Sequence, residues 1–150
     1  MILTNEKMEK RILYLTDPED TAFSREPENQ INSRIINCTT KYSADGAKKT
    51  IKNPNKKEKI IGTVIFGYKF LSKQSKDLPS LIEVFKEKDL QWLVMLPSDY
   101  SFSQEKKNKI KRKLLDLGAS EVLDYNAGDR SYINPIYKTF EKYLNNKNAI

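Results

Sequence analysis

The most hydrophobic run of the chain, residues 60–66, leads directly into Gly67, Tyr68 and Lys69. A short, continuous, β-branched run of this kind is typical of a strand buried on both faces of a parallel sheet. Such a strand delivers the residues after it to the carboxyl edge of the sheet, where α/β proteins usually carry their chemistry. Here that edge receives a glycine, a phenol and an amine, but no carboxylate, thiol or imidazole.

Strand and helix patterns alternate along the rest of the chain. Apolar, β-rich segments predict further strands at residues 11–16, 90–96 and 121–125, and 35–40 fits either a helix end or a strand. Helices are predicted from about 27, at 47–51, at 77–88, from 101 or 103 to 117, and from 134, with a loop at 69–76. This order predicts about five parallel strands and about five helices, joined by right-handed crossovers.

The length of 150 residues suits one domain with a sizeable core, so we expect a single domain over 1–150 with frayed tails at 1–9 and 145–150. No apolar run approaches the roughly 20 residues that span a bilayer. The first residues lack a basic region followed by an apolar stretch, which argues against a signal peptide. We therefore expect a cytoplasmic protein with no membrane partner.

Several classes of chemistry are excluded by residue type. The chain has no histidine, which rules out a Ser-His-Asp centre and histidine-ligated zinc. Its single cysteine, Cys38, cannot form an intrachain disulfide and is predicted to be a small buried hydrophobe. The glycine-rich phosphate-binding motifs are absent as well, so we expect no cofactor and no enzymatic activity.

Four junctions carry motifs that form an ordered series. They are an apolar strand ending in Asp-Pro at 11–18, Ala-Asp-Gly-Ala at 44–47, a strand at 92–96, and Leu-Gly-Ala leading into a short strand at 117–123. In this order they resemble the receiver domain of two-component response regulators, the CheY-like family. The resemblance implies a flavodoxin-like three-layer sandwich, with a five-stranded parallel sheet in the order 2-1-3-4-5 and helices on both faces.

The resemblance also implies a phosphorylation pocket, most of whose groups are missing. The acceptor aspartate would follow the third strand, where Gly67 and Tyr68 stand, and the acidic pair after the first strand is reduced to Asp17. Ser98 offers the hydroxyl after the fourth strand one residue late, and Tyr125 stands where a lysine is expected. Phosphoryl transfer needs a carboxylate nucleophile and a divalent cation. We therefore expect a degenerate pocket, a pseudo-receiver, with no catalytic residue.

A cluster of acids follows the first predicted strand. Asp17, Glu19 and Asp20 can hold a hard cation through carboxylate oxygens. Three acids in one turn are more often a solvated loop, and Asp-Pro is a common turn former. We expect no metal centre, with Asp17 as the one candidate ligand.

The strongest charge feature is a basic helix predicted over 106–113, within a chain of net charge +7. Its single apolar residue, Ile110, is predicted to point inward. In the resemblance this is the fourth helix, which forms the usual docking face together with the fifth strand and fifth helix. A basic face selects an acidic protein or a phosphate backbone, whereas a merely solvated helix is the alternative. The candidate partner-binding residues are Lys106, Lys107, Lys109, Lys111, Arg112, Lys113 and the interface anchors Tyr125 and Tyr132.

Three functions fit these observations. The first is a phosphorylation-independent signalling or protein-interaction domain that binds an acidic protein, or a second copy of itself, through the basic face. The second is a nucleic-acid-binding accessory protein that uses the same helix. The third is a small Rossmann-type enzyme or nucleotide-binding protein with its site near Asp17, Tyr68 and Ser98.

Overall fold

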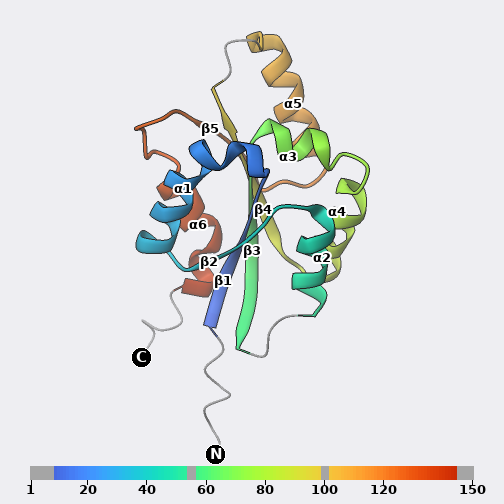
Figure 1. Ribbon diagram of the computed structural model, residues 1–150, viewed down its shortest axis with the longest axis vertical. Coiled ribbons are helices and arrows are strands. Elements are labelled where there is room, and N and C mark those ends of the chain that lie inside the picture. Colours follow the sequence, from blue (N-terminus) through green and yellow to red (C-terminus); the bar gives the residue numbers. More distant parts are fainter. Residues whose placement is uncertain (1–8, 54–56, 99–101, 145–150) are drawn as a thin grey trace, which may run out of the picture.

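The centre of the molecule is a five-stranded, all-parallel sheet (Figure 1). The computed structural model describes residues 9–53, 57–98 and 102–144. The strands are β1 (Glu9–Thr16), β2 (Cys38–Lys41), β3 (Glu58–Phe66), β4 (Gln91–Pro97) and β5 (Glu121–Tyr125), in the spatial order β2-β1-β3-β4-β5. The predicted flavodoxin-like sheet and its strand order are confirmed.

Helices cover both faces of this sheet, which gives three layers (Figure 1). A short 3-10 helix, η2 (Pro18–Asp20), connects β1 to α1. One face is covered by α1 (Thr21–Arg34) and α6 (Ile133–Leu144). The other is covered by α2 (Ala44–Lys52), α3 (Tyr68–Lys73), α4 (Leu78–Glu87) and α5 (Gln104–Asp116). Each face has its own apolar cluster, because a parallel sheet must bury both sides.

The central strand β3 shows why residues 60–66 are apolar throughout. Ile65 packs toward α2–α5, whereas Val64 and Phe66 pack toward α1 and α6. The strand ends at Phe66, and the Gly67 N–H donates to the Met95 carbonyl of β4 at 2.9 Å. Gly67 therefore lies at the carboxyl end of the central strand, as predicted.

The prediction of a loop at 69–76 is wrong in its first half, because Tyr68–Lys73 forms the helix α3. The helical turn places Phe70 fully inside the α2–α5 cluster. It also places Lys69 and Lys73 four residues apart on one side of the helix. Six residues are too few to show a helical apolar period, which is why the pattern was not visible in the sequence.

The other elements differ from prediction mainly at their ends. Helix α1 begins at Thr21 rather than near Pro27, which lies inside the helix and is buried. Strand β2 starts only at Cys38, because the Ile35 and Ile36 N–H groups still bond to the Ile31 carbonyl at the end of α1. Six α-helices and η2 are present in the described residues, against the five helices predicted.

Three further expectations can be compared with the structure. Cys38 is half-buried rather than fully buried, and burial raises the pKa of its thiol to about 12, so the thiol stays neutral at physiological pH. Glu9 already belongs to β1, and the rest of both expected tails lies outside the described residues. Within the part of the chain that is described, no helix has both the length and the apolar character needed to cross a bilayer.

Candidate functional site

The predicted pocket residues meet at the carboxyl edge of the sheet. Asp17 and Gly67 follow Thr16 and Phe66, which are register partners in β1 and β3. Ser98 follows β4, and its N–H donates to the carbonyl of Tyr125, the last residue of β5, at 2.9 Å. The topology thus gathers these groups along one edge, where the resemblance placed them.

Two carboxylates of the acidic turn after β1 form ion pairs with two lysines of α3. The Asp17 side chain is only 5% exposed and accepts the Glu19 N–H at 2.9 Å, which shapes η2. Its Oδ2 also accepts from Lys73 Nζ at 3.1 Å. Glu19 pairs with Lys73 at 2.6 Å and with Lys69 at 3.4 Å. Lys73 therefore bridges the two carboxylates.

These ion pairs hold the groups in their charged forms. Hydrogen bonds to the Glu19 and Asp17 carboxylates raise the pKa of Lys73. The hydrogen bond from Lys73 lowers the pKa of Glu19. The sequence analysis did not assign Lys69 or Lys73 to the pocket, because it treated their segment as a loop. Their spacing of four residues was the available signal, since such residues share one side of a helix.

The backbone at the acceptor position suits only glycine. Gly67 has φ 97° and ψ 154°, a region that residues with a Cβ essentially do not occupy. A Cβ built there would lie 2.6 Å from Asp20 Oδ2. Asp20 is 8% exposed, and burial raises the pKa of its carboxyl group. The Asp20 carboxylate thus occupies the space into which a side chain at position 67 would extend.

A small cavity of about 230 Å³ lies beside Asp20 at this edge. Tyr68, Lys69 and Ser98 contribute to its wall. The Ser98 hydroxyl is hydrogen-bonded to the side-chain oxygen of Asn126. The predicted hydroxyl is therefore near the pocket but already has a partner.

Within the described part of the chain, no set of side chains is suited to the divalent cation that the receiver resemblance implies. Among the residues that the structure describes, no three His, Cys, Asp or Glu side chains are grouped so as to hold a metal ion. The Asp17 carboxylate, the one candidate, is already bound to the Glu19 N–H and the Lys73 amine. A tethered ammonium group takes the place of an added cation at this turn.

The expectation that Tyr125 and Tyr132 are exposed interface anchors is wrong. They are only 5% and 2% exposed, because their rings pack between the sheet and α6. The Tyr125 ring lies 5.4 Å from that of Phe66 and 5.8 Å from that of Tyr132, measured between centroids. The Tyr125 hydroxyl donates to Glu26 at 3.0 Å. Burial, and to a lesser extent this hydrogen bond, raises the pKa of Tyr125 to about 12.

The predicted basic helix is α5, and its cations fall into two groups. Lys107 and Lys111 contact Asp124 of β5 at 3.8 and 3.0 Å. The other four cations are exposed on the surface of the helix, namely Lys106, Lys109, Arg112 and Lys113. Ser103 caps the helix by accepting the Lys106 N–H at 3.1 Å, while the other predicted cap, Ser101, lies outside the described residues.

Several solved structures with this fold are response regulator receivers. A receiver protein from Sinorhizobium medicae WSM419 is 14% identical, with 92% of this chain and 96% of that chain covered and a TM-score of 0.58. The receiver domain of a putative Luxo repressor protein from Vibrio parahaemolyticus is 12% identical, with 95% and 97% covered and a TM-score of 0.59. A CheY-like receiver domain protein from Methanospirillum hungatei JF-1 is 17% identical, with 89% and 95% covered and a TM-score of 0.61.

These similarities define the class of fold. The chain has the receiver-like, flavodoxin-like fold of response regulators over nearly its whole length. No protein-family model matches the sequence, and no curated protein matches it. The likeness is therefore one of three-dimensional structure, and what the site does must be argued from its own residues.

Proposed function

We propose that this protein is a signalling and protein-interaction domain of receiver-like fold that acts without phosphorylation and is not an enzyme. The observation that carries the proposal is the sheet edge around Gly67. Its backbone conformation excludes an acceptor side chain, and Lys73 occupies the carboxylate of Asp17. Transfer of a phosphoryl group to an aspartate would need both a free carboxylate and a divalent cation.

The proposed interaction face is formed by α5, β5 and α6. Its candidate partner-binding cations are Lys106, Lys107, Lys109, Lys111, Arg112 and Lys113. Asp124 compensates two of them and leaves four exposed cations. A surface of this sign favours an acidic protein partner, while self-association through the same face is the other arrangement.

The test of phosphorylation independence is incubation with acetyl phosphate and Mg²⁺, followed by intact-mass spectrometry. We expect no added phosphate and no change in the amide NMR spectrum. A phosphorylatable receiver domain treated in parallel serves as the control. A hydroxylamine-sensitive phosphate on any carboxylate of the protein, Asp20 included, would contradict the proposal.

The four exposed cations of α5 also support a second candidate, binding to nucleic acid. Such binding would weaken steeply with salt, with a slope of about −0.9 in log affinity against log salt for each duplex phosphate neutralised. Titration of a labelled duplex and a labelled single strand at several salt concentrations tests this candidate. Absence of binding at low salt would exclude it.

A further inference from the structure

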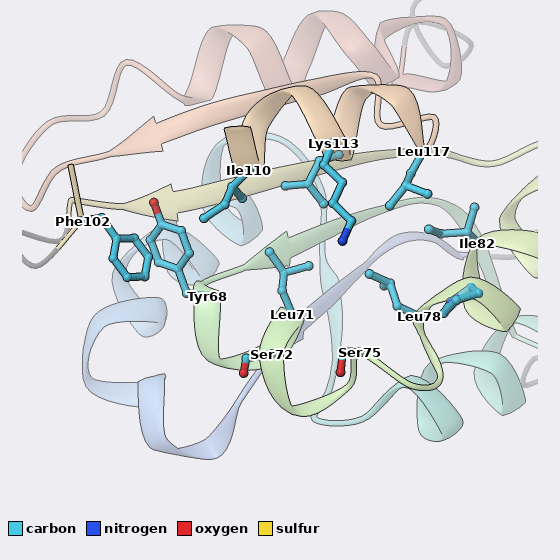
Figure 2. Close-up of a pocket in the computed structure, with 12 residues that line it drawn as sticks. Tyr68, Leu71, Ser72, Ser75, Leu78, Ile82, Phe102, Ile110, Lys113 and Leu117 are labelled. Carbon is cyan, nitrogen blue, oxygen red and sulfur yellow. The ribbon is translucent and has the colours of Figure 1, made fainter. Parts of the chain in front are cut away.

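An apolar groove of about 410 Å³ separates α5 from α3 and α4 (Figure 2). One wall carries Leu71, Leu78 and Ile82, and the other carries Ile110, Leu114 and Leu117. At one end the rings of Tyr68 and Phe102 stack edge to face, with centroids 4.7 Å apart. Lys107 and Lys111, which pair with Asp124, do not line the groove.

The α5 wall is an amphipathic helix face that the fold only partly covers. Ile110, Lys113, Leu114 and Leu117 are spaced i, i+3, i+4 and i+7, so they share one side of the helix. Leu114 is buried, whereas Ile110 and Leu117 are half-buried. The opposite wall does not close over them, and Leu71 is also left half-buried. The groove is thus an incomplete helix-packing surface.

Positive charge borders this groove along α5. Lys106, Lys109 and Lys113 are spaced i, i+3 and i+7, next to the apolar face. Within the described residues, Lys109 and Lys113 form no ion pair, and Lys106 lies 4.2 Å above the centroid of the Phe102 ring. Figure 2 shows the Lys113 side chain extending from α5 toward the opposite wall, with its amine between the two apolar walls. An occupant with both apolar and anionic groups would complement this surface.

We propose that the groove binds an acidic amphipathic helix of a partner protein. This inference rests on the proposed function and specifies its partner, but it assigns binding to the α3–α4 side of α5 rather than to β5 and α6. A helix laid in the groove places apolar residues at i, i+4 and i+7 between the two walls. Carboxylates along the border of that face then pair with the three lysines, which sets register and orientation.

The shape of the surface favours a helix over a compact small molecule. The lysine row from Lys106 to Lys113 and the apolar row from Ile110 to Leu117 each extend over about two turns of α5, and together they cover about three turns, or roughly 16 Å. An aligned helix of similar length can contact both rows. A compact amphiphile would not reach from Lys106 to Leu117.

The test uses a synthetic, fluorescently labelled peptide of about 18 residues, long enough to form a helix on binding. Leucines occupy one face and glutamates its border, and a second peptide of the same composition has the leucines scattered around the helix. We expect saturable 1:1 binding of the first peptide only, as measured by fluorescence anisotropy. The changes in amide chemical shift that the peptide causes in the NMR spectrum of the protein should centre on Leu71, Ile110 and Leu117.

Two pairs of variants separate groove binding from general attraction between charges. Lys113→Glu should weaken binding about tenfold or more, whereas Arg112→Glu, the same charge change on the far side of α5, should change it less than about threefold. Ile110→Ser should likewise weaken binding, while Leu115→Ser, on the exposed side of the same helix, should not. Circular dichroism and urea unfolding verify that each variant is folded.

Several outcomes would overturn the inference. One is an equal loss of peptide affinity in Lys113→Glu and Arg112→Glu. Others are equal binding of the two peptides or no saturable binding of either. Displacement of the peptide by DNA, with no NMR shift changes at the groove residues, would also contradict it. Sedimentation that shows a dimer closed over the groove would assign the surface to a second copy instead. Peptide shifts confined to β5 and α6 would also overturn it, yet would leave the proposed function standing. An aspartyl phosphate formed from acetyl phosphate would remove the proposed function without changing the peptide result.

Discussion

At the scale of single residues, Gly67 determines what the sheet edge can do. Gly67→Asp would return a carboxylate to the acceptor position, but φ 97° and the nearby Asp20 oxygen both oppose it. We expect the variant to lose at least about 2 kcal/mol of unfolding free energy and to remain unphosphorylated by acetyl phosphate. Urea denaturation and intact-mass spectrometry measure the two effects.

The matched control for that variant is Gly128→Asp. Gly128 also has a positive φ, 84°, but a Cβ there would meet nothing within 4 Å. We expect the control to lose only about 1 kcal/mol. Adding Asp20→Asn to Gly67→Asp should recover part of the stability, because the neutral amide removes the repulsion between carboxylates. Equal losses in the two single variants would show that Asp20 does not matter.

Lys73 is the second residue whose role can be isolated. Lys73→Met removes the amine that bridges Asp17 and Glu19, so the urea midpoint should fall further than in Lys49→Met. Lys49 is the matched control, because its pair with Asp45 is fully exposed at the surface and such pairs contribute little.

The Lys73 contribution should depend on pH in a defined direction. The pKa of Glu19 lies below its ordinary 4.5, so the stabilisation is present above 4.5 and is lost as pH falls through the lowered value. The pKa of Lys73 lies above its ordinary 10.5, so the stabilisation is complete below 10.5 and is lost only at higher pH. The difference between wild type and Lys73→Met should therefore be largest between these limits. A difference that does not change with pH would contradict the ion-pair account.

At the scale of elements, the contact between α6 and β3 depends on a missing side chain. A Cβ at Gly62 would lie 2.0 Å from Phe140 Cε1, and the Phe140 ring is fully buried. We expect Gly62→Ala to cost about 1–3 kcal/mol through overpacking. Combining it with Phe140→Leu should cost less than the sum of the two single changes, as measured by a double-mutant cycle.

A second glycine provides the comparison for that substitution. Gly46 lies in helix α2, where a Cβ would approach only the Ser43 side-chain oxygen, at 3.2 Å, as its nearest contact. Gly46→Ala should be neutral or stabilising by up to about 1 kcal/mol, because alanine favours helices. Similar losses in both variants would indicate that the Phe140 contact is not responsible.

The elements also show which features a sequence can predict. Strands β3 and β4 are recognisable from the sequence because their continuous apolar runs end at Phe66 and Leu96, before turn residues. The short strand β5 is recognisable mainly through the Leu-Gly-Ala step that precedes it. Helix α3 was missed because a single buried aromatic, Phe70, fixes it through tertiary packing rather than through a repeating pattern. Its lysines were missed for the same reason, since their ion pairs exist only once the helix has formed.

At the scale of the whole molecule, the parallel sheet follows from the alternation of elements, and the order of its strands follows from the resemblance. The absence of an acceptor carboxylate at Gly67 was also visible in the sequence. The burial of Tyr125 and Tyr132 was not, because an aromatic near a chain turn fits the core and the surface equally well. Which side of α5 stays uncovered depends on how α3 and α4 pack, and no local pattern records that.

The buried tyrosines should make the alkaline titration of the protein biphasic. The chain has eight tyrosines. Burial raises the pKa of Tyr14 and Tyr132 and raises that of Tyr125 to about 12, from an ordinary value of 10.0. In the spectrophotometric titration these three phenols should therefore ionise at higher pH than exposed phenols, or only on unfolding. Tyr125→Phe should remove one of these late phenols, whereas ionisation of all eight near pH 10 would contradict the prediction.

The same shifts predict how stability changes at high pH. The folded-state pKa values exceed those of the unfolded chain, so the unfolded state releases protons first. Stability should be fully present below pH 10 and should fall as pH rises from 10.0 toward about 12. Urea midpoints across this range, compared with those of Tyr125→Phe, measure the effect.

The ion pairs around Lys73 have a further consequence for motion. η2 leads into α1 on one side of the sheet, while Lys73 belongs to α3 on the other side (Figure 1). The contacts of Lys73 with Asp17 and Glu19, together with the Lys69–Glu19 pair, therefore connect helical layers on opposite faces of the sheet. Segments joined in this way open together, so the amides of η2 and α3 should exchange with one common opening free energy. In Lys73→Met the two segments should open separately, with two different values. The acidic turn after β1 thus links the helical layers at the carboxyl edge of the sheet.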